Sequence, residues 1–170
     1  PTILLPASYP NVAIIHVQSA DMYGNCVING TDATCQEMAM AAEHTIVTCE
    51  RIVPHRHITR RPKEINIPFF AVDAVVHVPF GAYPTNCRRY YHFNKEHIAT
   101  FHALSTRLLK GHPEGLKAYY DDYILGSHTF EDFIDHFPAR KLMEEYHSEM
   151  ENYERMIGTG TSAISQPDSE

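Results

Sequence analysis

Val12-Ala-Ile-Ile-His-Val17 is the stretch of the sequence that decides the fold class. A short apolar run of this kind is typical of a strand covered on both faces, as in a parallel sheet. The turn-forming run Asp21–Asn25 separates it from a brief strand expected at Cys26–Ile28. A further strand is expected at Thr45–Cys49, and the longest apolar run, Phe69–Val78, predicts a buried strand.

The remaining elements are expected to be helices. Thr34 and Glu37 form a capping-box pair, which predicts the start of a short helix between two strands. In the second half of the chain, Asn94 can cap a helix that Gly111 ends. The elements together predict an α/β fold, with a layered, mostly parallel sheet and helices, that ends in a helical C-terminal part. The other helices expected in that part open at Pro113, cover Thr129–Phe137 and run along Leu142–Ile157.

The composition limits the class of protein. The chain has 170 residues, 44% hydrophobic and 21% charged, which suits one ordinary globular domain. Residues 1–157 are expected to form that domain, and the small, polar residues 158–170 a tail. A net charge of -7, with no basic cluster denser than Arg56–Lys63, argues against nucleic acid or an anionic membrane as the main partner. No apolar run approaches the ~18 residues of a transmembrane span.

The cysteines and the first residue bear on the cellular compartment. The chain opens at Pro1 without a charged leader or an apolar segment, so no signal peptide is expected. Because Pro1 is not a methionine, we expect that the chain either lost its start or was cut from something longer. The cysteines lack the short spacings of zinc and redox motifs, which indicates reduced thiols in a cytoplasmic protein; they are Cys26, Cys35, Cys49 and Cys87.

The loop Pro79–Cys87 is the first candidate binding site. It follows the predicted buried strand, and in open α/β sheets ligands bind beyond the carboxyl ends of the strands. Gly81 and Ala82 are small enough to let a ligand approach the backbone. The alternative is a Pro/Gly turn that only leaves the sheet, and the residues by themselves leave both interpretations open.

A second polar segment, Gln18–Asn25, also follows a strand. An Asx-type turn that joins two strands would explain Asp21, Gly24 and Asn25. Gln18 has no such explanation and remains a candidate for ligand binding.

Other reactive side chains favour structural interpretations. His55 and His57 form a His-x-His pair, but no carboxylate or thiol with ligand spacing accompanies them, so a solvated basic loop is favoured and no metal is expected. Cys49 is interpreted as a buried structural cysteine, because no histidine is assigned to activate its thiol. Asp73 lies inside an apolar run and must be hydrogen-bonded or paired if charged. It marks a site or, at least as well, a buried structural acid that caps a neighbouring loop.

Several of these segments resemble the alpha subunits of class I CoA-transferases. Asn11–Gln18, followed by Ala20–Asn25, is similar to a strand of that family that ends in a turn of the form Ala-Asp-x-x-Gly-Asn. Ala41–Val53 is similar to the family's next helix and strand, which end in Glu, any residue, then Ile-Val.

The glutaconate branch of the family gives the more specific resemblance. Ile67-Pro68 and Val72-Asp-Ala-Val-Val76 have counterparts there, and Pro79–Pro84 resembles its aromatic-Gly-Ala-His-Pro loop. Tyr83 departs from the branch, which has histidine at that place. The order and spacing of the similar segments extend over residues 11–137.

The resemblance implies that the chain is the C-terminal half of an alpha subunit of a heteromeric CoA-transferase, which moves CoA between an acyl-CoA and a carboxylic acid. The family's nucleophile is a beta-subunit glutamate that becomes a glutamyl-CoA thioester; Glu43 and Glu50 do not match its motif, so no catalytic residue is expected here. Coenzyme A would be a cosubstrate, without a metal. The implied partners are the missing N-terminal half, a beta subunit, an acyl-CoA and a small carboxylic acid. The implied substrate and CoA pocket lies at Gln18, Gly81, Ala82, Tyr83, Pro84 and Asn86.

Two other functions remain open at this point. Relatives of the glutaconate branch include a hydrolase that opens the ring of CoA-linked steroid fragments, and the two activities differ at the nucleophile that this chain lacks. The other alternative is a non-catalytic scaffold or binding domain, because a fold does not fix a function.

Overall fold

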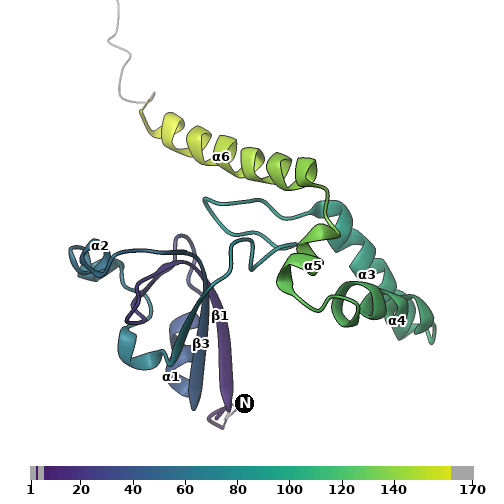
Figure 1. Ribbon diagram of the computed structural model, residues 1–170, viewed down its shortest axis with the longest axis horizontal. Helices are drawn as coiled ribbons and strands as arrows, with labels where there is room; N and C mark the ends of the chain where they lie inside the picture. Colours follow the sequence, from purple (N-terminus) through teal and green to yellow (C-terminus); the bar gives the residue numbers. More distant parts are fainter. Residues whose placement is uncertain (1–2, 4–5, 162–170) are drawn as a thin grey trace, which may run out of the picture. The chain divides into compact units, whose positions relative to one another are not determined.

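The computed structural model describes residue 3 and residues 6–161, with side chains up to Arg155. The chain divides into two compact units, Pro1–Ala82 and Tyr83–Glu170 (Figure 1). We call them unit 1 and unit 2 and describe each by itself. The domain limits predicted at residues 157 and 158 stay a prediction.

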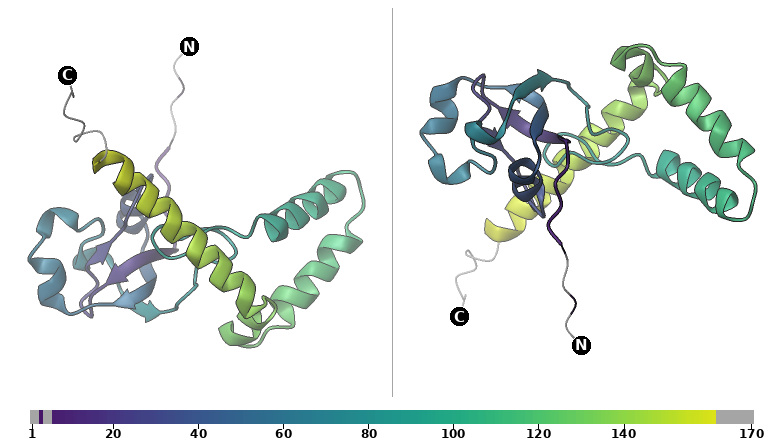
Figure 2. Two further views of the ribbon diagram at one scale, coloured as in Figure 1. Left: turned by 90° about the horizontal axis from the view of Figure 1, so that it is seen from above. Right: turned by 90° about the horizontal axis from the view of Figure 1, so that it is seen from below.

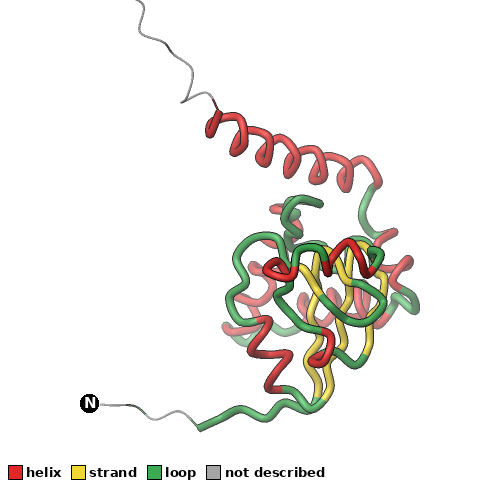
Figure 3. The backbone as a smooth tube through the Cα atoms, turned by 90° about the vertical axis from the view of Figure 1, so that its left-hand side faces the viewer, coloured by secondary structure: helices red, strands yellow, loops and turns green. Residues whose placement is uncertain are grey.

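Unit 1 is built on a four-stranded sheet with the strand order β2-β1-β3-β4. β1 pairs in parallel with β3, and β3 pairs in parallel with β4, whereas the short β2 is antiparallel to β1. Figure 3 shows these strands as adjacent yellow tubes. The mostly parallel sheet predicted from the apolar runs is thereby confirmed. The strands are β1 (Val12–Ala20), β2 (Cys26–Val27), β3 (His44–Ile52) and β4 (Ala74–His77).

One face of the sheet forms the core of unit 1. Successive side chains of a strand point to opposite faces, so alternate residues of β1 and β3 reach the same side. Helix α1 (Cys35–Ala41) covers this side and contributes Ala39 to the core (Figure 1). The side chains buried here include Ala13, Ile15, Val17, Val47 and Cys49.

The opposite face of the sheet is open. Val12 is 49% exposed, Ile14 67% and Val76 44%. The prediction that the first strand is covered on both faces is therefore wrong for this chain by itself. The apolar run is consistent with cover from another polypeptide, because isolated sheets seldom leave a row of branched aliphatic residues in water.

The predicted strand Phe69–Val78 is wrong in its first half. Phe69–Ala71 form a 3-10 helix, η2, and β4 begins only at Ala74. The amide of Phe69 donates to the side-chain oxygen of Asn25 at 3.2 Å, and the amide of Ala71 bonds to the carbonyl of Pro68 at 3.0 Å. These bonds close a turn, which leaves the Phe69 ring in solvent.

The expected capping box at Thr34 does not form. Thr34 precedes α1 but makes no side-chain cap bond, and Asp32 accepts from the amide of Cys35 at 3.1 Å instead. The prediction of a solvated loop at His55 and His57 is also wrong. Both histidines lie in a short helix, α2 (His55–Thr59). A 3-10 turn, η1 (Pro62–Glu64), follows it.

Unit 2 is helical, as expected. The Asn94 side chain accepts from the amide of His97 at 3.1 Å, and Gly111, with φ 87°, follows the end of the same helix, so both predicted ends of this helix are confirmed. Helices α3 and α4 form a hairpin (Figure 2). The last helix continues past residue 157 to residue 161, and residues 162–170 of the expected tail lie outside the described residues. The elements are α3 (Lys95–Leu109), α4 (Glu114–Tyr120), a π-helical turn η3 (Asp121–Leu125), α5 (Phe130–Asp135) and α6 (Ala139–Thr161).

In the described part of the chain, no helix combines the length and the apolar character that crossing a membrane would require.

Candidate functional site at the strand ends

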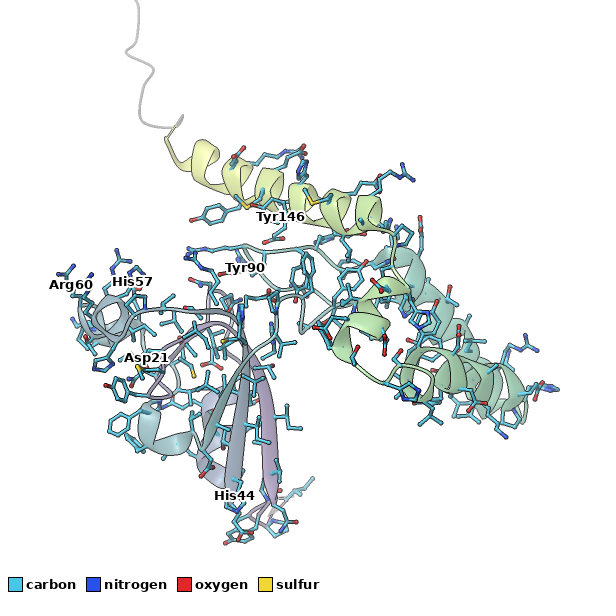
Figure 4. The ribbon with its side chains drawn as sticks, in the orientation of Figure 1. Asp21, His44, His57, Arg60, Tyr90 and Tyr146 are labelled. Atoms are coloured by element: carbon cyan, nitrogen blue, oxygen red, sulfur yellow. The ribbon has the colours of Figure 1, made fainter. Side chains whose placement is uncertain are left out.

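Polar side chains gather on the open face of unit 1, from the middle of β1 and β3 toward their carboxyl ends. His16 pairs in register with Thr48, and Glu50 lies two residues further along β3 on the same face. Figure 4 shows His44 at the other end of the strands, the amino end of β3. We call His16, Thr48 and Glu50, with the backbone of Phe80 and Gly81, the strand-end cluster. Its place matches the general position of ligand sites in open α/β sheets.

The imidazole of His16 is held on both sides within this cluster. Its Nε2 lies 2.8 Å from a carboxylate oxygen of Glu50, and its Nδ1 lies 2.8 Å from the hydroxyl of Thr48. Because a carboxylate only accepts, Nε2 carries a proton. The Thr48 hydroxyl can rotate to donate to a neutral ring or accept from a charged one. The ring orientation is therefore fixed whichever form is present.

Glu50 also fixes the loop that follows β4. The second oxygen of its carboxylate accepts from the amide of Phe80 at 2.9 Å. Phe80 has φ 61°, a left-handed conformation that usually costs a residue other than glycine about 1 kcal/mol or more. The charge-assisted bond that the Phe80 amide donates to a buried carboxylate offsets that cost. The Glu50 side chain thus acts as a positioning group for the loop.

Gly81 packs against the His16 ring. A Cβ at residue 81 would lie 2.7 Å from Cε1 and 2.8 Å from Nδ1 of His16, and 2.9 Å from the carbonyl oxygen of Val78. Real Cβ atoms do not approach so closely, so only glycine fits here without movement of the ring or the backbone. The requirement for glycine comes from this contact, because the φ of Gly81 lies outside the left-handed range.

The predicted pocket residues are divided between the units. Gln18, Gly81 and Ala82 belong to unit 1, and Gln18 forms two bonds with the backbone of Asn29, at 3.0 and 3.2 Å. The side chain of Gln18 therefore fixes the backbone after β2 at Asn29. The sequence did not indicate this structural role. The residues of unit 2 are Tyr83, Pro84 and Asn86.

Within unit 2, Tyr83 is a core residue. Its hydroxyl accepts from Asn94 at 2.7 Å, and its ring meets that of Phe137 edge-on at 4.8 Å. Burial raises the pKa of Tyr83, although the bond from Asn94 opposes this. Pro84 accepts from the amide of Asn94 at 3.0 Å, whereas Asn86 is exposed. The assignment of all six predicted residues, three in each unit, to a substrate pocket stays a prediction.

Two structural interpretations from the sequence, those of Asp21 and Cys49, are confirmed. Asp21 is buried and accepts from the amides of Tyr23 and Asn25, each at 3.0 Å, as an Asx-type turn requires. Cys49 is buried, which raises the pKa of its thiol, so it is unreactive. Asp73 accepts from the amide of Thr45 at 2.7 Å, but its side chain is 55% exposed, so the burial expected for this acid is wrong.

Sequence reasoning missed His16 and Glu50 as a pair. They are 34 residues apart, and only the parallel register of β1 and β3 brings them together. The signal was present as polar residues at alternate positions near the ends of two otherwise apolar strands.

Residues 1–78 match the family model for coenzyme A transferase. An uncharacterized protein of Archaeoglobus fulgidus is 41% identical over 145 residues, which cover 85% of this chain and 31% of that protein. A glutaconate CoA-transferase subunit of Acidaminococcus fermentans is 30% identical over 141 residues, which cover 83% of this chain and 42% of that subunit.

The fold agrees with these sequence relationships. The crystal structure of glutaconate coenzyme A-transferase from Acidaminococcus fermentans matches with a TM-score of 0.71 and 31% identity, over 78% of this chain and 40% of that chain. The chain is thus a homologue of the coenzyme A transferases, and the resemblance to the alpha subunit of the glutaconate branch is confirmed. It spans less than half the length of the relatives it matches.

Proposed function

We propose that this chain is one part of the alpha subunit of a heteromeric CoA-transferase, which moves CoA between an acyl-CoA and a carboxylic acid. The observation that carries the proposal is the similarity in sequence and fold to the glutaconate CoA-transferase of Acidaminococcus fermentans over most of this chain. That relative is named as a subunit, which implies at least one further subunit. The missing half of the alpha subunit is one partner that we propose, and a beta subunit is the other.

The proposed reaction is an exchange in two steps. The carboxylate of a partner glutamate attacks the thioester carbonyl and releases the CoA thiolate, which leaves an anhydride between the glutamate and the acid. The thiolate then attacks the glutamate carbonyl of this anhydride, so that the acid leaves as a carboxylate with one glutamate oxygen and the sulfur of CoA becomes bonded to the glutamate. An incoming carboxylate then reverses these changes and takes the CoA away. No electrons are transferred, and covalent catalysis divides one difficult step into two easier ones.

The contribution proposed for this chain is to shape the pocket. The strand-end cluster holds the loop at Phe80 and Gly81 at the carboxyl ends of the strands, where a ligand would approach. Gly81 and Ala82 would then border the acyl-CoA, as the resemblance implies. Cytoplasmic location is part of the proposal, and the four free cysteines support it.

The isolated chain is expected to be inactive. We expect no CoA transfer from glutaryl-CoA or acetyl-CoA to a second carboxylate with the purified 170-residue chain, because no glutamate in it matches the family's nucleophile. The assembled protein, expressed with its neighbouring subunits, should transfer CoA, and its partner subunit should gain the mass of CoA less one water. Intact mass spectrometry measures both the co-purifying chains and that adduct.

The result with the isolated chain also separates the alternatives. Transfer by this chain alone would contradict the proposal. An assembled protein that hydrolyses the acyl-CoA, or opens a ring in it, without passing CoA to an acid would indicate the hydrolase instead.

The open sheet face is expected to be covered by a partner polypeptide. Val12, Ile14 and Val76 present a row of exposed aliphatic side chains, and soluble monomers rarely keep such surfaces in water. Light scattering should therefore show association rather than a 19.4 kDa monomer. The variant Ile14→Lys should weaken assembly, whereas Leu109→Lys, at an exposed position of α3, should not. A well-behaved monomer, or equal effects of the two variants, would count against a covered face.

A further inference from the structure

A second cluster in unit 1 lies at the turn after β1 and includes a histidine held by a buried acid. Nδ1 of His55 lies 2.7 Å from a carboxylate oxygen of Asp21, whose side chain has no exposed surface. The carboxylate only accepts, so Nδ1 carries the proton, and in the neutral ring Nε2 is left as an acceptor. Nε2 has no hydrogen-bond partner among the described residues. The Asx-type turn accounts for the burial of Asp21. It does not account for a histidine, His55, whose ring orientation is fixed while its Nε2 stays available to a ligand.

That imidazole borders an open pocket with aromatic walls. The pocket has a volume of about 240 Å³ and is lined by Tyr23, Asn25, His55 and Phe69. Tyr23 is 57% exposed and Phe69 56%, and the Tyr23 ring meets the His55 ring edge-on with centroids 4.6 Å apart. Pockets that enclose a drug-sized ligand have roughly 300–1,000 Å³. This one accepts a single planar ring system and not a whole cofactor.

The segment that supplies His55 carries all the cationic charge of unit 1. Every Lys and Arg residue of Pro1–Ala82 lies within Arg51–Lys63, although the whole chain has a net charge of -7. Figure 4 shows His57 on α2 and Arg60 directly after it, with Asp21 below them in the view. Arg61 is paired with Glu64 at 3.6 Å, and among the described residues the other cations of this segment have no ion-pair partner. These cations are therefore available to pair with an anionic ligand.

We propose that the pocket formed by Tyr23, His55 and Phe69 binds the base of a purine nucleotide, whose phosphates face the basic segment Arg51–Lys63. The aromatic walls receive the planar base, and Nε2 of His55 accepts a hydrogen bond from its exocyclic amine. In the proposed reaction the ligand with this chemistry is the nucleotide end of CoA. The identity of the nucleotide rests on the proposed function, whereas the binding of a purine nucleotide does not.

The test is a calorimetric titration of the assembled protein with adenosine 3′,5′-bisphosphate, and with AMP and ADP for comparison. Tyr23→Ala and Phe69→Ala should each raise the Kd for the bisphosphate about tenfold, because they remove a surface on which a base stacks. Phe70→Ala is the matched control, since Phe70 is the neighbouring exposed ring and does not line this pocket. His55→Gln should weaken binding more than His57→Gln, and the melting temperature of each variant shows whether it is folded.

A kinetic measurement then distinguishes the sources of the nucleotide. Tyr23→Ala should raise KM for an acyl-CoA and leave KM for the matching acyl-pantetheine, which lacks the nucleotide, unchanged. Equal affinity of AMP, ADP and the bisphosphate, with unchanged KM for the acyl-CoA, would overturn the assignment to CoA. Unchanged Kd in all pocket variants would overturn the purine site, even if CoA transfer is observed. Loss of the partner polypeptide from Tyr23→Ala would identify the pocket as an interface contact and overturn it too.

Discussion

Replacement of Gly81 by valine is expected to lower kcat/KM of the assembled enzyme by about 100-fold, because small displacements of groups near a substrate have effects of this size. The new Cβ would lie 2.7 Å from the His16 ring, which Thr48 and Glu50 hold in place. The carbonyl of Val78 blocks the other direction at 2.9 Å. The loop must therefore move, and with it the backbone that we propose borders the acyl-CoA. Steady-state kinetics of the assembled protein measure the effect.

The same substitution should also destabilise the fold, by about 1–3 kcal/mol, as overpacking does. The substitution does not spare the core, because the new side chain would meet the ring of His16. The matched control is Ala118→Val, at an exposed position of α4 in unit 2, which should change neither kinetics nor stability appreciably. If Gly81→Val destabilises the protein yet leaves kcat/KM unchanged, the loop is only a packed turn. An unchanged kcat/KM in the variant Ala82→Leu would lead to the same conclusion about the loop.

Elements set by local chemistry could be predicted from the sequence. The apolar runs located β1 and β3, and the polar run Asp21–Asn25 located the turn between β1 and β2. Asn94 and Gly111 marked the ends of α3, because a cap needs only residues close in sequence. Such features depend on a few neighbouring residues, and the sequence contains all of them.

Elements set by distant contacts could not be predicted. Phe69–Ala71 have the residue types of a strand, but the amide of Phe69 donates to the side-chain oxygen of Asn25, 44 residues away, and a 3-10 turn forms there. Thr34 and Glu37 match a capping box, but Asp32 provides the side-chain bond at the start of α1. In the first case a distant contact accompanies the turn, whereas in the second two local caps, Thr34 and Asp32, compete and the sequence does not decide between them.

The candidate site was predicted only in its location. The carboxyl ends of parallel strands pointed to the loop after β4, and Gly81 lies there. The partners of that loop, His16 and Glu50, depend on the register of the sheet, which a single sequence does not show. The bond between Asp21 and His55 likewise joins residues 34 apart through the position of α2. The histidine that sequence analysis assigned to a solvated loop is thus fixed to a buried acid.

Asp21→Ala is expected to cause the largest loss of stability of any single substitution considered for unit 1, roughly 3–5 kcal/mol in the free energy of unfolding. Its carboxylate accepts from the amides of Tyr23 and Asn25, from the Asn25 side chain at 2.9 Å, and from His55. Removal of the acid leaves several of these donors buried without an acceptor. Asp73→Ala is the matched control. Asp73 also accepts a backbone bond, but its side chain is 55% exposed, so its loss should cost about 1 kcal/mol.

The difference between the wild-type protein and Asp21→Ala should depend on pH. Burial raises the pKa of Asp21, but the bonds from Asn25, His55 and Tyr23 outweigh burial and hold that pKa below its ordinary value of 3.8. A carboxyl group with a lowered pKa in the folded state stabilises the protein above the pKa of the unfolded state. That contribution is lost as the pH falls below 3.8 and through the folded-state value. Urea unfolding at neutral pH and at successively lower pH should therefore show the two proteins converging in acid. A difference that stays constant from pH 7 to pH 3 would mean that Asp21 acts through packing and not through its charge.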